Sequence, residues 1–314
     1  MNTISNNTVA ILSDLSGAMQ SLDASKLIAP DDSVSPAFIT AFGIRSLALN
    51  VRTQGLTFPG LPFTTPGNQN ISRCKWQRYK NEVIIEELKS LFTNCPIISF
   101  ADWSDTDGAS SLWDGLLSDV IKPLHKKDFE FIFYLGDPTK SLVQEVDEIL
   151  DIISNFSLYG RVTLVLDEEE ASRLWMALNG YGTGIPVSAV KLPCQGEQCL
   201  SIFNTMKIDH LLVCSVDKAL SFSRQTQFEL ADRPHHTART TKEVRNHFNT
   251  GYSLGLRLRW EIPRCVALGL AVSGSYKENG GSPDRSALLS YIKQWMAEAG
   301  QPDNHAVGEM KAAV

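Results

Sequence analysis

The residues best suited to do chemistry follow predicted strands. Asp102 and Trp103 follow the apolar run 96–100 after one alanine, and the acidic run Asp167 to Glu170 follows the β-run 161–166. Ligands bind at the carboxyl ends of strands in α/β sheets, so Asp102 and Trp103 are candidates to face one. Both groups also have a structural interpretation, because Trp103 can pack in a core and acidic residues in a first helical turn suit the helix dipole.

A second stretch, residues 240–256, predicts a loop that turns into a helix near Asn246. Gly251 and Gly255 lie four residues apart and therefore share one face of that helix. A glycine in a helix interior costs about 1 kcal/mol relative to alanine. We therefore expect the bare face to pack closely against a neighbour.

The six cysteines do not form the pattern of a disulfide framework. Cys194 and Cys199 have a spacing compatible with a turn and, only weakly, with a metal or redox pair. No second cysteine pair or His-x₃-His partner accompanies them, so the sequence does not favour a metal centre there.

Composition excludes several classes of function. The 314 residues carry a formal net charge of −6, which argues against nonspecific binding to nucleic acid or anionic membrane. No apolar run reaches the length of a membrane span, and the polar residues 1–7 do not resemble a signal peptide. We expect a cytoplasmic protein without a nucleic-acid or membrane partner.

Strand and helix patterns alternate from about residue 80 onward. Buried strands are predicted at 96–100, 129–135, 161–166 and 209–216, and helices at 80–92, 111–124, 143–156, 263–276 and 286–297. Residues 8–22 form a further predicted helix, and 184–201 a connection. This alternation predicts an α/β fold with a parallel sheet covered on both faces.

Asn246 to Tyr252 resembles the Asp-His-Phe-Asn-Ala-Gly-Phe run of the PfkB/ribokinase family of carbohydrate kinases. Segments within about residues 70–295 resemble further family motifs in the same order, among them 101–104, 136–141, 167–171 and 280–283. The resemblance implies a ribokinase-like three-layer α/β/α sandwich with a mostly parallel central sheet. It also implies ATP-dependent phosphoryl transfer to a sugar or nucleoside hydroxyl, with ATP and Mg²⁺ as cofactors.

The same resemblance implies a set of site residues. Residues 167–170 resemble the family's Asn-x-x-Glu motif, which helps to organise magnesium and phosphate. Glu170 matches it and is the candidate metal ligand, whereas Asp167 replaces the asparagine and is a candidate phosphate-site residue. Ser215 falls in the turn that contacts the nucleotide. Asp102 and Trp103 fall where a sugar would bind.

The phosphate-binding segment departs from the family pattern. Glu243, Val244 and Arg245 replace its Gly-Ala-Gly, and Asn246 replaces its aspartate base. The family glycines let backbone N–H groups approach a phosphate at a helix N-terminus, whereas these replacements bring negative charge and bulk. Loss of a general base typically costs about 10²–10⁴ in rate, so the resemblance favours the fold and argues against ordinary kinase activity.

The amino-terminal part also departs from the family. If the helix at 8–22 corresponds to the family's first long helix, then the opening strand, the lid strands and the substrate-binding glycines are reduced or missing. We expect a shortened, single ribokinase-like domain over residues 1–300, with a loop or remnant lid at 53–70. Residues 301–314 are expected to form a flexible tail.

Two functions remain in competition at this stage. One is a catalytically impaired carbohydrate kinase homologue that retains a sugar or nucleoside ligand. The other is a non-catalytic pseudokinase with a ligand-binding, regulatory or oligomer-forming role, with a homodimer as the candidate assembly. A truncated gene product with an exposed, aggregating sheet is a third interpretation.

Overall fold

The computed structural model describes most of the chain from residue 76 onward and shorter parts before it. The described residues are 2–3, 8–22, 47–52, 55–56, 76–78, 80–94, 96–101, 103–105, 108–141, 143–182, 184–215, 218–233, 242–281 and 283–300. Asp102, the tail 301–314 and most of the predicted loop 53–70 therefore lie outside the described residues.

In the described part of the chain, nine strands form one sheet in the order β1-β9-β8-β7-β6-β5-β4-β2-β3. Its parallel centre consists of β2 (Leu47–Arg52), β4 (Ile97–Ala101), β5 (Phe129–Tyr134), β6 (Gly160–Asp167) and β7 (His210–Cys214). Antiparallel pairing adds β8 (Lys218–Ser223), β9 (Thr226–Ala231) and the two-residue β3 (Gly55–Leu56). The expected mostly parallel sheet is confirmed.

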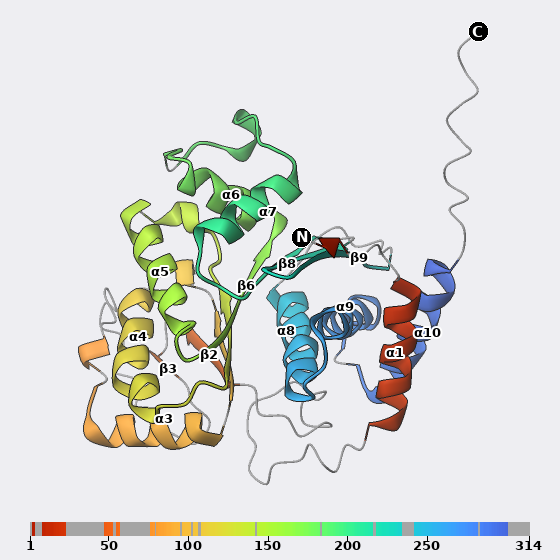
Figure 1. Cartoon of the computed structure of the whole chain (residues 1–314), viewed down its shortest axis with the longest axis horizontal. Helices are drawn as coiled ribbons and strands as arrows, with labels where there is room; N and C mark the ends of the chain where they lie inside the picture. The colour runs from red at the N-terminus through yellow and green to blue at the C-terminus, as the bar shows by residue number, and fades with distance from the viewer. Residues whose placement is uncertain are drawn as a thin grey trace.

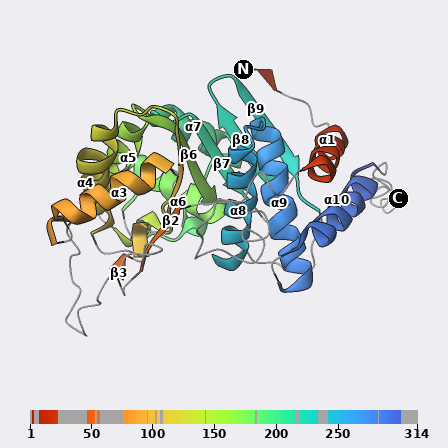
Figure 2. The same ribbon diagram turned by 90° about the horizontal axis from the view of Figure 1, so that it is seen from below.

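Helices cover both faces of this sheet (Figures 1 and 2). One layer holds α3 (Glu82–Asn94), α4 (Ala109–Leu116), α5 (Val143–Phe156), α6 (Glu168–Leu178) and α7 (Gln195–Thr205). The other holds α1 (Thr8–Ser21), α8 (Lys242–Arg257), α9 (Ile262–Asn279) and α10 (Arg285–Ala299). Among the described helices, none combines the length and apolar character needed to cross a membrane.

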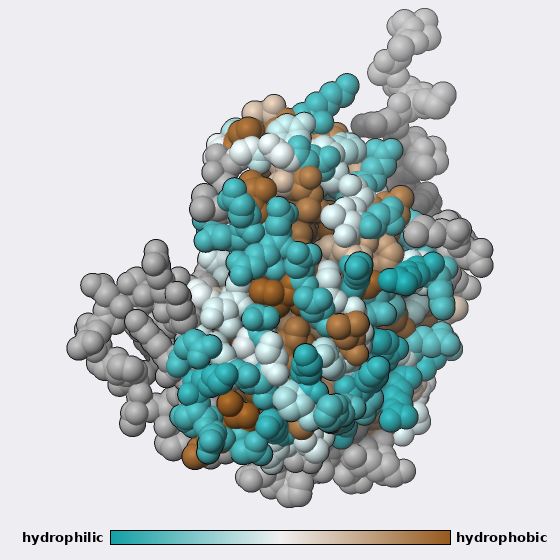
Figure 3. All heavy atoms as spheres, turned by 60° about the vertical axis from the view of Figure 1, so that its left-hand side comes forward, coloured by the Kyte–Doolittle hydropathy of each residue, from teal (hydrophilic) through white to brown (hydrophobic). Residues whose placement is uncertain are grey.

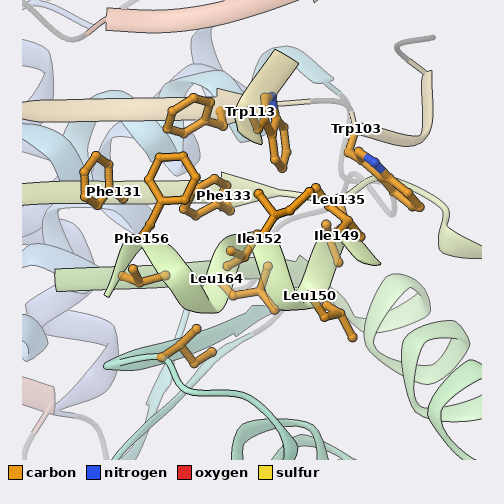
Figure 4. Packing of buried hydrophobic residues seen from close by; sticks show 14 of the residues in the cluster. Trp103, Trp113, Phe131, Phe133, Leu135, Ile149, Leu150, Ile152, Phe156 and Leu164 are labelled. Carbon is orange, nitrogen blue, oxygen red and sulfur yellow. The ribbon is translucent and has the colours of Figure 1, made fainter. Parts of the chain in front are cut away.

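Alternation along the central strands supplies both cores, because successive strand residues point to opposite faces. In β5, Phe131 and Phe133 face the layer of α3 to α7, while Ile132 and Tyr134 face the layer of α8. Phe133 meets the Phe156 ring edge-on at a centroid distance of 5.0 Å (Figure 4). Hydrophilic residues cover most of the face in Figure 3, with hydrophobic residues in small separate groups.

Helices α8 and α9 pack closely through the two glycines. A Cβ atom added at Gly251 would lie 2.6 Å from the Leu268 carbonyl oxygen, and one added at Gly255 would lie 2.8 Å from the Cys265 Cα atom. Both distances are shorter than real Cβ contacts. The expectation that the bare face of this helix packs against a neighbour is confirmed.

Several predicted elements need correction. Helix α8 begins at Lys242 rather than near Asn246, because Val244 and Arg245 favour a helix where glycines would favour a loop. Residues 184–201 are not a plain connection, since α7 starts at Gln195 and places Cys199 within it.

The sheet also holds strands that the sequence did not predict. The hairpin of β8 and β9 extends the sheet beyond β7. A two-residue strand, β1 (Asn2–Thr3), precedes α1 and pairs with β9, so the expected absence of a strand there is wrong. The antiparallel neighbour of β2, β3, has two residues.

Candidate functional site

The site begins where β6 ends and α6 starts. Asp167 is the N-cap of α6: its Oδ1 atom accepts a 2.7 Å hydrogen bond from the Glu170 backbone N–H. In turn, the Oε2 atom of Glu170 accepts a 2.9 Å hydrogen bond from the Asp167 backbone N–H. This reciprocal capping box satisfies two backbone donors at the helix start. It also fixes both carboxylates at the carboxyl end of the sheet.

Arg245, in the first turn of α8, binds the two oxygens that the capping box leaves over. Its NH1 donates to Glu170 Oε1 and its NH2 to Asp167 Oδ2, both at 2.9 Å. All four carboxylate oxygens therefore have a hydrogen-bond donor. We call this arrangement of Asp167, Glu170 and Arg245 the arginine clip.

The arginine clip is partly shielded from water. The exposed fractions of its side chains are 20% for Arg245, 28% for Asp167 and 8% for Glu170. Burial alone would lower the pKa of the Arg245 guanidinium, but the carboxylates of Glu170 and Asp167 outweigh it and raise this pKa above its ordinary value. Arg245 therefore stays charged at neutral pH.

Burial has the opposite consequence for the carboxylate. It raises the pKa of Glu170 above its ordinary value, and the charge of Arg245 offsets this only in part. Glu170 thus depends on Arg245 to carry its negative charge in this position, since an unpaired buried carboxylate tends to take up a proton.

Beneath the clip lie a phenol and a thiol. The Arg245 guanidinium carbon is 5.9 Å from the centre of the Tyr134 ring, within the range of a cation–π contact. Burial raises the pKa of Tyr134 well above its ordinary value and that of Cys214 to about 12. Both groups therefore stay protonated at neutral pH, so neither can act as a general base or a nucleophile there.

A small cavity adjoins the clip between β6, β7, α8 and α9. Its volume is about 30 Å³, and Asp167, Ser215, Arg245, Ser273 and Lys277 are among its lining residues. A water molecule needs about 10–15 Å³, so the cavity holds no more than a few waters.

The residues present do not fit the Mg²⁺ and phosphate that the resemblance implied. Mg²⁺ takes carboxylate oxygens as ligands, but those of Asp167 and Glu170 are already bound by backbone N–H groups and a guanidinium. Within the described part of the chain, no group of three or more His, Cys, Asp or Glu side chains is arranged to hold a metal ion.

Of the other predicted site residues, Ser215 and Val244 line the small cavity beside the clip, whereas Trp103 packs elsewhere and Asp102 lies outside the described residues. Trp103 is 5% exposed and packs in the core of Figure 4, where its Nε1 atom donates to Ser110 Oγ at 2.9 Å. Ser215 donates its backbone N–H to the Lys218 carbonyl at 2.8 Å, closing the turn after β7. Asn246 is exposed on α8. Glu243 belongs to α8, and its side chain is outside the described atoms.

Sequence reasoning missed two contacts that seat α8 on the sheet. Asn249 Nδ2 donates to Ser99 Oγ at 2.9 Å, and the hydroxyls of Tyr252 and Thr163 lie 3.2 Å apart. It also missed the arginine clip, since Arg245 was considered for contact with a phosphate and not as a partner of Asp167 and Glu170. A signal existed, because the motif similarities had assigned Asp167, Glu170 and Arg245 to the same phosphate site.

Comparison with protein families gives one extensive match. A family model described as prokaryotic ketohexokinase matches residues 56–295. A comparison with curated proteins gives no significant match.

Solved structures give distant similarities. An adenosine kinase from Sinorhizobium meliloti matches with 12% identity and a TM-score of 0.47, covering 66% of this chain and 56% of that one. Arabidopsis thaliana ribokinase complexed with ribose and ATP matches with 16% identity and a TM-score of 0.47, covering 68% and 59%. Phosphofructokinase-2 from Escherichia coli in complex with fructose-6-phosphate matches with 13% identity and a TM-score of 0.46, covering 69% and 62%. The chain thus spans 56% to 62% of the length of these three proteins.

Proposed function

The chain belongs to the prokaryotic ketohexokinase family, and we propose that it is a PfkB-type carbohydrate kinase homologue with very weak or absent phosphoryl transfer. Asp167, Glu170 and Arg245 bind one another at the place where such a kinase would hold phosphate.

The arginine clip is the observation that supports this most strongly. Arg245 donates to both Asp167 and Glu170 at 2.9 Å. Mg-ATP would have to displace a charged guanidinium from two carboxylates, and the guanidinium itself repels Mg²⁺. The clip therefore does internally what a metal ion would otherwise do, since it neutralises the two carboxylates.

The residue at the position of the family's proton acceptor supports the proposal independently. Asn246 carries no carboxylate, and three of the described acidic residues that follow β5 and β6 are held by arginines. Asp137 accepts a 2.8 Å bond from Arg173 NH1, and Asp167 and Glu170 belong to the clip. General-base loss costs about 10²–10⁴ in rate, and this loss adds to that from the blocked phosphate site.

We propose that the role left to the protein is non-catalytic. The scaffold would serve in ligand binding, regulation or the formation of a homodimer. The family description makes a ketohexose the first ligand to test, ahead of nucleosides and other sugars.

The experiment is a direct assay of phosphoryl transfer. Purified protein is incubated with Mg-ATP and a panel of ketohexoses, aldoses and nucleosides, and sugar phosphate is measured by mass spectrometry. An authentic ketohexokinase serves as the positive control. We expect no product above the level without enzyme, whereas stoichiometric conversion of any sugar would refute the proposal.

A further inference from the structure

A second and much larger cavity lies at the opposite edge of the sheet. Its volume is about 630 Å³, within the range of small-molecule sites. Helix α8 runs from one edge to the other: Arg245 meets the end of β6 at Asp167, and Leu256 lines this cavity beside Arg161 near the start of β6. The cavity is therefore separate from the arginine clip.

Its lining is positively charged although the chain as a whole is acidic. Lys127, Arg161, Arg257 and Arg259 face two carboxylates, those of Asp128 and Glu130, whereas the formal net charge of the chain is −6. We call these four cations the basic groove.

Both carboxylates of the lining are already occupied. Arg161 Nε donates to Glu130 at 2.8 Å, and Lys126 lies 3.7 Å from Asp128. In the part of the chain that the structure describes, Lys127, Arg257 and Arg259 form no ion pair. Three cations that form no ion pair among the described residues therefore line one cavity.

Arg259 occupies a position where glycine is favoured. Its φ is +56°, in the left-handed region. Its N–H donates to the Leu256 carbonyl, and the Trp260 N–H donates to the Gly255 carbonyl at 3.0 Å. These two bonds form the Schellman motif that ends α8, in which the left-handed residue is usually glycine. The helix C-cap alone would favour glycine at this position, so we looked for a role of the Arg259 side chain.

Apolar residues complete the cavity. Ile97, Leu256 and Trp260 contribute to its wall, and the Arg264 guanidinium carbon lies 5.6 Å from the centre of the Trp260 ring. A ligand that suits this lining has a concentrated negative charge and an apolar part. We propose that the basic groove binds a small phosphate ester, with Arg257 and Arg259 donating to its phosphate oxygens and the apolar wall contacting its organic part.

The competing explanation is electrostatic support of the helix end. Cations near a helix C-terminus interact favourably with its dipole, and this would account for Arg257 and Arg259 without any ligand. The two explanations predict different stabilities for the arginine variants. Under the dipole explanation both arginines support the fold, whereas under the proposal Arg259→Gly keeps or raises stability, because glycine removes the left-handed strain.

The test uses phenyl phosphate as the probe, titrated by calorimetry into the full-length protein at constant ionic strength. We expect saturable binding that weakens about tenfold in Arg257→Gln and in Arg259→Gly, since each loses a charge-assisted hydrogen bond. Arg224→Gln, an exposed arginine in the turn between β8 and β9, is the matched control and should bind as the wild type does.

Two results would overturn the proposal. One is the lack of saturable binding at millimolar phenyl phosphate in the wild-type protein. The other is equal affinity in wild type, Arg257→Gln and Arg259→Gly, which would place the ligand elsewhere. Thermal unfolding of Arg259→Gly without ligand shows whether the variant is folded, so a loss of binding in a folded variant is not a loss of structure.

Discussion

Arg245 NH1 and Glu170 Oε1 lie 2.9 Å apart although 75 positions separate the two residues in the sequence. This contact ties the first turn of α8 to the first turn of α6 across the carboxyl edge of the sheet. It joins two segments that the resemblance assigned to one phosphate site. The same ion pair thus has a consequence for stability and one for ligand binding.

Replacing Arg245 should destabilise the fold. In Arg245→Gln, the Glu170 side chain, which is only 8% exposed, would have to take up a proton or rearrange. Breaking such a pair by removing one partner leaves a buried charge. We expect a loss of about 3 kcal/mol in the free energy of unfolding in urea at neutral pH.

Arg224→Gln is the control for that measurement, because surface substitutions away from special features usually change stability by less than about 0.5 kcal/mol. If Arg245→Gln matched this control, the clip would contribute nothing to the fold. The carboxylates would then be free to bind other cations.

Two glycine-to-alanine substitutions should change the free energy of unfolding in opposite directions. Gly251→Ala places a Cβ atom 2.6 Å from the Leu268 carbonyl oxygen and should cost about 1–3 kcal/mol through overpacking. Gly17→Ala in α1 meets no heavy atom within 4 Å and should stabilise by about 0.5–1 kcal/mol through helix propensity. Thermal unfolding of both variants checks this. A stabilised Gly251→Ala would contradict the close packing of α8 on α9.

Stability should fall in acid through one histidine. Burial lowers the pKa of His210 from 6.5 to about 4, so the unfolded chain binds this proton more readily than the folded one. The contribution of neutral His210 is present above pH 6.5 and is lost as the pH falls towards 4, by about 3 kcal/mol in total.

His210→Gln isolates this effect, because every other titrating group is shared with the wild-type protein. The difference in unfolding free energy between the two proteins should change across the interval from pH 6.5 to 4 in favour of the variant. A constant difference over that interval would show that His210 titrates normally.

Most of the fold could be predicted from local sequence patterns, and the elements that were missed are those with weak local patterns. Runs such as 161–166 and the glycine pair at 251 and 255 report burial directly, so the parallel sheet and the close contact of α8 with α9 were predictable. The hairpin of β8 and β9 was missed although Leu220 and Phe222 alternate with Ser221 and Ser223 as in a strand. Each strand has only six residues, and both serines are buried, so the polar positions do not report burial.

The site was harder to predict than the fold. Motif similarity assigned Asp167, Glu170 and Arg245 to one region, but only the structure shows that they bind one another. Ion pairing depends on side-chain distance and burial, and neither can be read from spacing along the chain. The basic groove was harder still to predict from the sequence, since Lys127 and Arg259 belong to separate segments that match no motif.

The central claim is that the arginine clip excludes Mg-ATP. The most direct measurement is thermal unfolding of the wild-type protein with and without millimolar Mg-ATP, with Mg²⁺ alone and tripolyphosphate alone as controls for other sites. A ligand that binds only the folded state raises the unfolding midpoint. The account predicts no rise specific to Mg-ATP, and a clear rise beyond both controls would contradict it.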